Sequence, residues 1–154
     1  MTDNEIRSIE LVLQHKESIA KYMAKFAAEL SYRSAIHDVS KFKKEELEVY
    51  AEFIDEMNKH PFNSPEEKEL REKYQTASIV HKKLNRHHPE HFENGMEGMN
   101  LIDLIEMLCD WRSASERSAG DSIRKGLPIM KDKYNISPQL LKILENTLKD
   151  FNLF

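Results

Sequence analysis

The sequence predicts an all-α protein, and three observations carry this prediction. Apolar side chains recur every three or four residues over long stretches, which is the spacing of one face of a helix. The chain has four glycines and five prolines, so few positions interrupt a helix. Almost no stretch alternates apolar and polar residues as a half-buried strand does. We therefore expect a compact bundle of six or seven helices, with residues 1–154 forming a single domain.

The first half of the chain contains three predicted helices. Their ranges are residues 4–30, 43–58 and 64–87. The first two follow from apolar periodicity alone. The third begins with Ser64 and Pro65, which are typical of an N-cap and a first-turn proline, and Glu67 completes a capping box. It should end near His87, because Pro89 disfavours helical backbone at the residue before it.

The second half of the chain is divided by a loop over residues 89–99 and by two further caps. Asn100 with Asp103 resembles a capping pair, and it opens a helix over residues 101–118. A short helix near residues 121–126 follows. Ser137 and Pro138 then cap a last helix that runs to about residue 151. No internal repeat or domain linker separates these elements.

Composition describes an ordinary globular protein, with 40% apolar and 32% charged residues. The net charge of −4 provides no general attraction to nucleic acid or to anionic membranes, so we expect neither duplex nucleic acid nor a membrane as partner. The longest apolar runs are too short to cross a bilayer. Residues 1–30 are charged throughout, unlike a signal peptide. The single cysteine, Cys109, excludes an internal disulfide and favours a cytoplasmic location.

Potential metal ligands recur along the chain in a suggestive order. They are His15, His37, Asp38, His81, His87, His88, His91 and Asp110. Neutral imidazoles and carboxylates are the ligands that zinc, manganese and non-haem iron prefer. The adjacent pair His37-Asp38 can place two ligands on one ion from a single turn of backbone. We therefore expect one or two divalent ions, drawn from Mn, Fe, Zn, Co and Ni, as the cofactor.

Simpler explanations exist for several of these residues taken singly. His15 shares a helix face with Val12 and Ile19, so it could be a hydrogen-bonded core histidine. Asp38 could cap the helix that follows it. His91 follows the turn at Pro89 and is not part of the predicted ligand set. The combined set favours a metal centre over these separate explanations.

The histidines after residue 80 and the acids of the helix over 101–118 complete the predicted site. His81 and His88 are two helical turns apart on one face, and the turn at Pro89 allows His87 to face the same cavity. Asp110 is the expected closing ligand. Glu106, one turn earlier, is a candidate catalytic base or a residue that orients a ligand histidine, whereas Asp103 is expected to be a cap.

These segments resemble the HD-domain superfamily of metal-dependent phosphohydrolases. Residues 35–41 (Ala-Ile-His-Asp-Val-Ser-Lys) resemble its central element, and residues 14–20 resemble its first helix. Residues 81–91 together with Cys109-Asp110-Trp111 are similar to a small branch that is common in phages and bacteria. The usual glycine before the lysine of the central element is Ser40 in this chain.

The resemblance implies a first ion held by His15, His37, Asp38 and Asp110, and a second held by His81, His87 and His88. It implies hydrolysis of a nucleotide-like phosphomonoester or phosphodiester by a metal-activated water. Lys41, Glu106 and Asp38 are the implied catalytic residues, with Lys41 neutralising phosphate charge. Three alternatives stay open: a di-iron oxygenase, a non-catalytic metal-stabilised binding protein, and a domain that binds a nucleotide without cleaving it. A homodimer also stays open.

Overall fold

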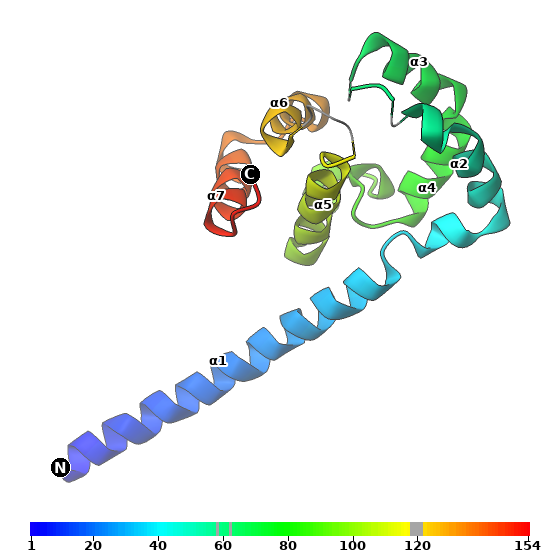
Figure 1. The fold of residues 1–154 in the computed structure, drawn as a ribbon. Coiled ribbons are helices and arrows are strands. Elements are labelled where there is room, and N and C mark those ends of the chain that lie inside the picture. The colour runs from blue at the N-terminus through cyan, green and yellow to red at the C-terminus, as the bar shows by residue number, and fades with distance from the viewer. Residues whose placement is uncertain (58, 62, 118–121) are drawn as a thin grey trace. The chain divides into compact units, whose positions relative to one another are not determined.

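The computed structural model describes residues 1–57, 59–61, 63–117 and 122–154. Within these ranges the chain forms seven α-helices, three short 3₁₀ helices and no strand, which confirms the predicted all-α class (Figure 1). No helix among the described residues has the length and apolar character that a membrane span requires. The contacts divide the chain into two units, Met1–Ile36 and His37–Phe154, and each is described by itself. The assignment of residues 1–154 to one domain stays a prediction.

The first unit consists of the helix α1, Asp3–Ile36, which has 34 residues and is therefore about 51 Å long. A reciprocal pair of hydrogen bonds starts it. The Thr2 backbone N–H donates to the Glu5 carboxylate at 2.6 Å, and the Glu5 N–H donates to the Thr2 hydroxyl at 3.3 Å. The helix runs six residues past its predicted end because residues 31–36 contain neither glycine nor proline.

The second unit contains the remaining elements. In chain order they are η1 (Val39–Phe42), α2 (Lys44–Met57), α3 (Pro65–Lys73), α4 (Gln75–Leu84), η2 (Pro89–His91), η3 (Gly95–Gly98), α5 (Leu101–Ala114), α6 (Ile123–Tyr134) and α7 (Pro138–Asp150). The three predicted N-caps are confirmed, because Ser64, Asn100 and Ser137 each accept a hydrogen bond from a backbone N–H of the helix that they open.

The single helix predicted over residues 64–87 is wrong, because it is two helices that end before His87. Tyr74 interrupts it between α3 and α4 with φ −104° and ψ 19°. The Tyr74 ring stacks on Phe53 of α2 at 4.3 Å between centroids, so a tertiary contact accompanies the break. The second helix ends at Leu84, because Asn85 adopts extended backbone and its side chain donates to the His81 carbonyl at 2.7 Å. His88 therefore does not share a helix with His81.

Two boundaries in the second half also differ from the predictions. The helix predicted over 101–118 ends at Ala114. The short helix predicted near 121–126 is the longer α6, which continues through Pro128 to Tyr134. Its apolar side chains at Ile123 and Leu127 are buried, and this burial favours the helix although proline lacks a backbone donor. Residues 118–121 lie outside the described residues.

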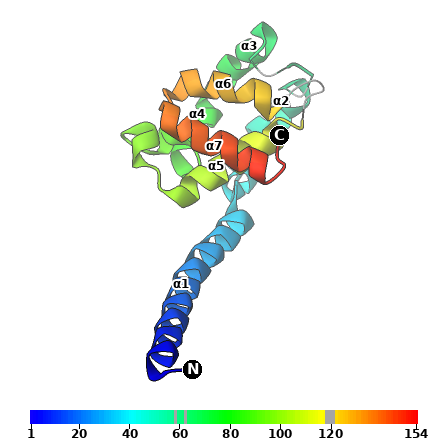
Figure 2. The same cartoon turned by 90° about the vertical axis from the view of Figure 1, so that its left-hand side faces the viewer.

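The apolar core lies between α5, α6 and α7, which stand together in both views of the ribbon (Figures 1 and 2). Its buried members are Met107, Leu108, Trp111, Ile123, Leu127, Ile136, Leu144 and Leu148. Met107 and Leu148 are completely inaccessible to solvent. The Trp111 ring stacks on Tyr134 at 5.9 Å. The opposite side of α5 faces a second interior, which is polar.

Candidate metal centre

The polar interior gathers side chains from four places in the second unit. They are His37 and Asp38 ahead of η1, His81 on α4, His87 and His88 in the loop after α4, and Glu106 and Asp110 on α5. The chain can turn sharply at Asp38 because this residue adopts left-handed backbone, with φ 55°. Aspartate tolerates that conformation better than most residues do. The Lys41 N–H donates to the Asp38 carbonyl at 2.9 Å and closes the turn.

Asp38 is the centre of this cluster. Its Oδ1 lies 3.1 Å from His81 Nε2 and 3.4 Å from His87 Nε2. Its Oδ2 forms an ion pair with Lys41 and lies 3.6 Å from His37 Nε2. Potential ligand atoms within 4.8 Å of one another form two overlapping groups: Asp38, His81, His87 and His88, and then His37, Asp38, His87 and Asp110.

Several of these atoms are buried without a hydrogen bond. Asp38 Oδ1, His87 Nε2 and His88 Nε2 have no hydrogen-bond partner among the described residues. Leaving a polar atom buried and unpaired costs about 1–3 kcal/mol. A cation bound between these atoms would satisfy all three at once, so the donor set fits a divalent metal ion.

Two carboxylates, that of the buried Glu46 and that of the partly buried Glu106, lie against the opposite nitrogens of the histidine rings. Glu46 Oε2 is 2.9 Å from His81 Nδ1. Glu106 Oε1 is 2.8 Å from His37 Nδ1 and 3.2 Å from His87 Nδ1. A carboxylate accepts a hydrogen bond from Nδ1–H, which keeps the proton on Nδ1 and leaves the Nε2 lone pair free to bind a metal. Three imidazoles therefore direct their Nε2 atoms toward Asp38.

The charge states of His88 and Asp38 suit metal binding. Burial, with the neighbouring His87 and His81, lowers the pKa of His88 to about 2, so this ring is neutral at physiological pH. Burial opposes ionisation of Asp38, but the nearby His81 ring and the hydrogen bond from Lys41 outweigh it and hold the pKa of Asp38 well below its usual range. The hydrogen bond to Glu106 raises the pKa of His37 against the effect of burial, so a metal bound at His37 would displace a proton from this ring. Histidine binds a metal as the neutral imidazole, and aspartate or glutamate binds it as the ionised carboxylate.

A cavity of about 350 Å³ opens beside the cluster. It is lined by His37, Asp38, Lys41, Phe42, Leu47, Tyr50 and Arg117. Lys41 Nζ lies 5.0 Å from the centre of the Tyr50 ring. Burial, with the charges of Glu46 and Asp38, raises the pKa of Tyr50 to about 12, so its hydroxyl keeps its proton. The cavity therefore combines cationic and aromatic side chains next to the candidate ligands.

The structure brings together most of the residues that the sequence singled out. The cluster and its edge contain His37, Asp38, Lys41, His81, His87, His88, Glu106 and Asp110. His15 belongs to α1 in the first unit, and its predicted role as a ligand stays a prediction. His91 Nδ1 lies 2.7 Å from the Lys83 carbonyl, and His91 belongs to neither ligand group. Asp103 completes the capping box of α5, as predicted.

Glu46 is the contributor that sequence reasoning missed. It stands in the charged run Lys43-Lys44-Glu45-Glu46, which is typical of a solvated helix start. A signal was nevertheless present, because Glu46 precedes Tyr50 by four residues and Phe53 by seven, and thus lies on the inner face of α2. An acidic residue on such a face indicates a buried partner.

One comparison with known proteins identifies a family. A family described as "Family of unknown function (DUF5662)" matches residues 4–150 of the chain. No curated protein and no solved structure matches the chain. Because the match covers nearly the whole sequence, the chain belongs to the DUF5662 family.

Proposed function

We propose that this protein is a metal-dependent phosphohydrolase that hydrolyses a phosphomonoester or phosphodiester of a nucleotide-like molecule. The observation that carries the proposal is the convergence of histidine Nε2 atoms on Asp38. His81 and His87 approach its Oδ1 within 3.4 Å, and each ring presents Nδ1 to a carboxylate. Such carboxylate–histidine pairs are typical of metal ligands.

Two ions are compatible with the overlapping groups. One would be held by Asp38, His81, His87 and His88, and the other by His37, Asp38 and Asp110, with His87 close to both. When bound, such ions supply Lewis acidity toward a phosphoryl group and lower the pKa of a water molecule toward neutrality. Asp38 is common to both groups, so its removal should affect the whole centre.

The cavity beside the cluster supports an anionic substrate with a flat apolar part. Lys41 lies at the boundary between the ligands and the cavity, where its charge would offset that of a phosphate. Arg117 adds a second cation to the lining. Tyr50 belongs to the same wall, and Phe42 is 78% exposed, so its ring is available to a planar group such as a nucleobase.

The position of Glu106 favours one of its two predicted roles. Its Oε1 contacts Nδ1 of His37 and of His87, on the ring side away from Nε2. A carboxylate placed there orients the two imidazoles and makes them more basic ligands. We therefore assign Glu106 to holding ligands in place and not to accepting a proton from water.

The first test is elemental analysis of wild type and Asp38→Ala, both purified without chelator. We expect stoichiometric Mn, Fe, Zn, Co or Ni in the wild type and its loss in the variant. The loaded wild type should then release phosphate from an aryl phosphate, an aryl phosphodiester or a nucleotide panel, and Asp38→Ala should not.

Three outcomes would overturn the proposal. Wild type that takes up no metal, even after reconstitution, would remove its basis. Metal binding with iron-dependent oxygen consumption and no phosphate release would indicate an oxygenase instead. Metal binding with neither activity would indicate a non-catalytic protein that the metal stabilises.

A further inference from the structure

Glu46 is held in a chain of hydrogen bonds that ends on a candidate metal ligand. It is 3% exposed, and its Oε2 lies 2.9 Å from His81 Nδ1. The Ser40 hydroxyl donates to the same Oε2 at 3.2 Å. The Asn85 side-chain amide donates to the Ser40 hydroxyl at 2.9 Å and to the His81 carbonyl at 2.7 Å. Glu46 thus contacts the His81 ring directly, and Ser40 and Asn85 hold Glu46 and the His81 backbone around it.

We infer that Glu46 is a positioning residue, which holds His81 in the tautomer and ring orientation that direct Nε2 at a metal ion beside Asp38. The inference rests on the metal site of the proposed function, and not on the reaction that the site performs. Its atoms are already placed for this role, since His81 Nε2 lies 3.1 Å from Asp38 Oδ1 while Nδ1 faces Glu46.

The tautomer matters because a neutral imidazole has one N–H and one lone pair. If Nδ1 carries the proton, Nε2 can bind a cation; if Nε2 carries it, no lone pair faces Asp38. Glu46 as a carboxylate can only accept a hydrogen bond, so it selects the first form. Asn85 Nδ2 and Ser40 Oγ also lie 3.1 and 3.3 Å from His81 Nδ1. The two amide hydrogens of Asn85 are donated to the Ser40 hydroxyl and the His81 carbonyl, and the Ser40 hydrogen is donated to Glu46. Neither group then has a hydrogen left for Nδ1, which is consistent with an Nδ1–H that donates to Glu46.

The cost of burying a carboxylate close to Asp38 supports a functional reason for Glu46. A buried ionised group is strongly disfavoured unless it is paired and hydrogen-bonded. Glu46 lies in the first turn of α2, where the helix dipole favours negative charge. A bound cation would offset the negative charge further, so Glu46 and a metal at His81 should stabilise each other.

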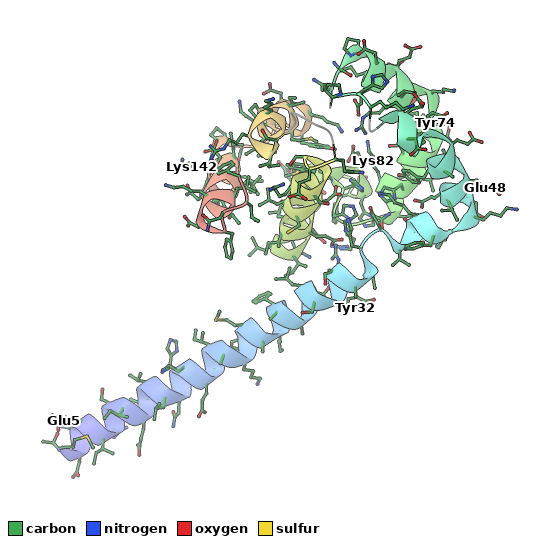
Figure 3. All side chains as sticks on the ribbon, viewed as in Figure 1. Glu5, Tyr32, Glu48, Tyr74, Lys82 and Lys142 are labelled. Carbon is green, nitrogen blue, oxygen red and sulfur yellow. The ribbon has the colours of Figure 1, made fainter. Side chains whose placement is uncertain are left out.

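The test measures binding of Co²⁺ alone to the metal-free full chain, in the wild type, Glu46→Gln and Glu48→Gln. Glu48 is the matched control, since it lies on the same helix with a side chain 67% exposed and points outward (Figure 3). Affinity is read by competition with a chelating dye, and coordination by the visible Co²⁺ spectrum. We expect Glu46→Gln to weaken binding by about 10–100-fold and to change the spectrum. Glu48→Gln should match the wild type.

The same measurement in a His81→Ala chain separates a positioning role of Glu46 from a general loss of structure. If Glu46 acts through His81, then Glu46→Gln should not weaken Co²⁺ binding further in a His81→Ala chain. Thermal unfolding of the metal-free variants shows whether each one folds. If Glu46→Gln fails to fold, Ser40→Ala replaces it in the test. We expect Ser40→Ala to weaken Co²⁺ binding in the wild-type chain and to have no further effect in the His81→Ala chain.

The results distinguish the inference from the proposed function. The role of Glu46 would be overturned if Glu46→Gln bound Co²⁺ with the affinity and spectrum of the wild type. It would also be overturned if Glu46→Gln weakened Co²⁺ binding equally in the wild-type and His81→Ala chains. Neither result would contradict the metal centre itself. A wild type that binds no Co²⁺ would overturn both. If the variants bind Co²⁺ as expected but the wild type releases no phosphate, the role of Glu46 as a positioning residue is supported. Only the proposal that the protein is a phosphohydrolase is then rejected.

Discussion

The two sides of α5 face interiors of opposite chemistry. Met107, Leu108 and Trp111 join an apolar core with α6 and α7, whereas Glu106 and Asp110 face histidines and carboxylates. The apolar side is stabilised by removal of its surface from water, and it needs no ligand. The polar side buries atoms that have no hydrogen-bond partner in the described part of the chain, which lowers stability unless a cation binds there. One helix thus separates the part that stabilises the fold from the part that we expect to perform the chemistry.

The largest expected effect tests the apolar side. Leu148 is fully buried on α7, so Leu148→Ala should lower the free energy of unfolding by about 2–5 kcal/mol. Chemical denaturation of metal-free protein measures this loss. Metal stoichiometry per folded chain should stay at the wild-type value, because no candidate ligand lies on α7. A variant that loses both stability and metal would show that the two interiors are not independent.

The next effect tests the polar side. Saturation of the wild type with metal at about one hundred times its dissociation constant should add about 2.7 kcal/mol to the free energy of unfolding. The same addition should appear in Leu148→Ala, since distant sites contribute additively. Asp38→Ala should gain nothing, because both ligand groups contain Asp38. Equal stabilisation of Asp38→Ala would place the metal elsewhere in the chain.

A third change separates metal binding from substrate binding within the polar side. Lys41→Met should lower kcat/KM for the substrate identified in the phosphate-ester screen at least about tenfold, or about 1.4 kcal/mol of transition-state stabilisation. The reason is the loss of a cation at the wall of the cavity. Metal content, measured on the same samples, should stay at the wild-type value. Unchanged kinetics would exclude Lys41 from substrate binding.

The smallest effect concerns the helix that both interiors share. Asn100 caps α5 by accepting from the Ile102 and Asp103 N–H groups at 2.9 and 3.0 Å. Asn100→Ala should therefore cost about 1 kcal/mol of stability. Denaturation with and without metal should give the same loss, because the cap precedes both sets of side chains. A loss seen only in the metal-loaded protein would link the start of α5 to the metal centre.

The helical elements were largely predictable because their signals are local. Ser64, Asn100 and Ser137 were recognised as caps from the residues around them, and the structure confirms all three. The failures lie where distant contacts compete with local preference. Stacking of Tyr74 on Phe53 accompanies the break between α3 and α4, and burial of Leu127 accompanies the continuation of α6 through Pro128.

The sequence by itself determined the all-α class and the residue types from which a metal site could be built. Only the tertiary structure decided which nitrogen of each imidazole faces Asp38, and that Glu46 belongs with His81. The reason is the distance between the partners along the chain. Glu46 and His81 are 35 positions apart, and His37 and Glu106 are 69 positions apart. Helical periodicity reports contacts over three or four residues, so it cannot pair side chains that only folding brings together.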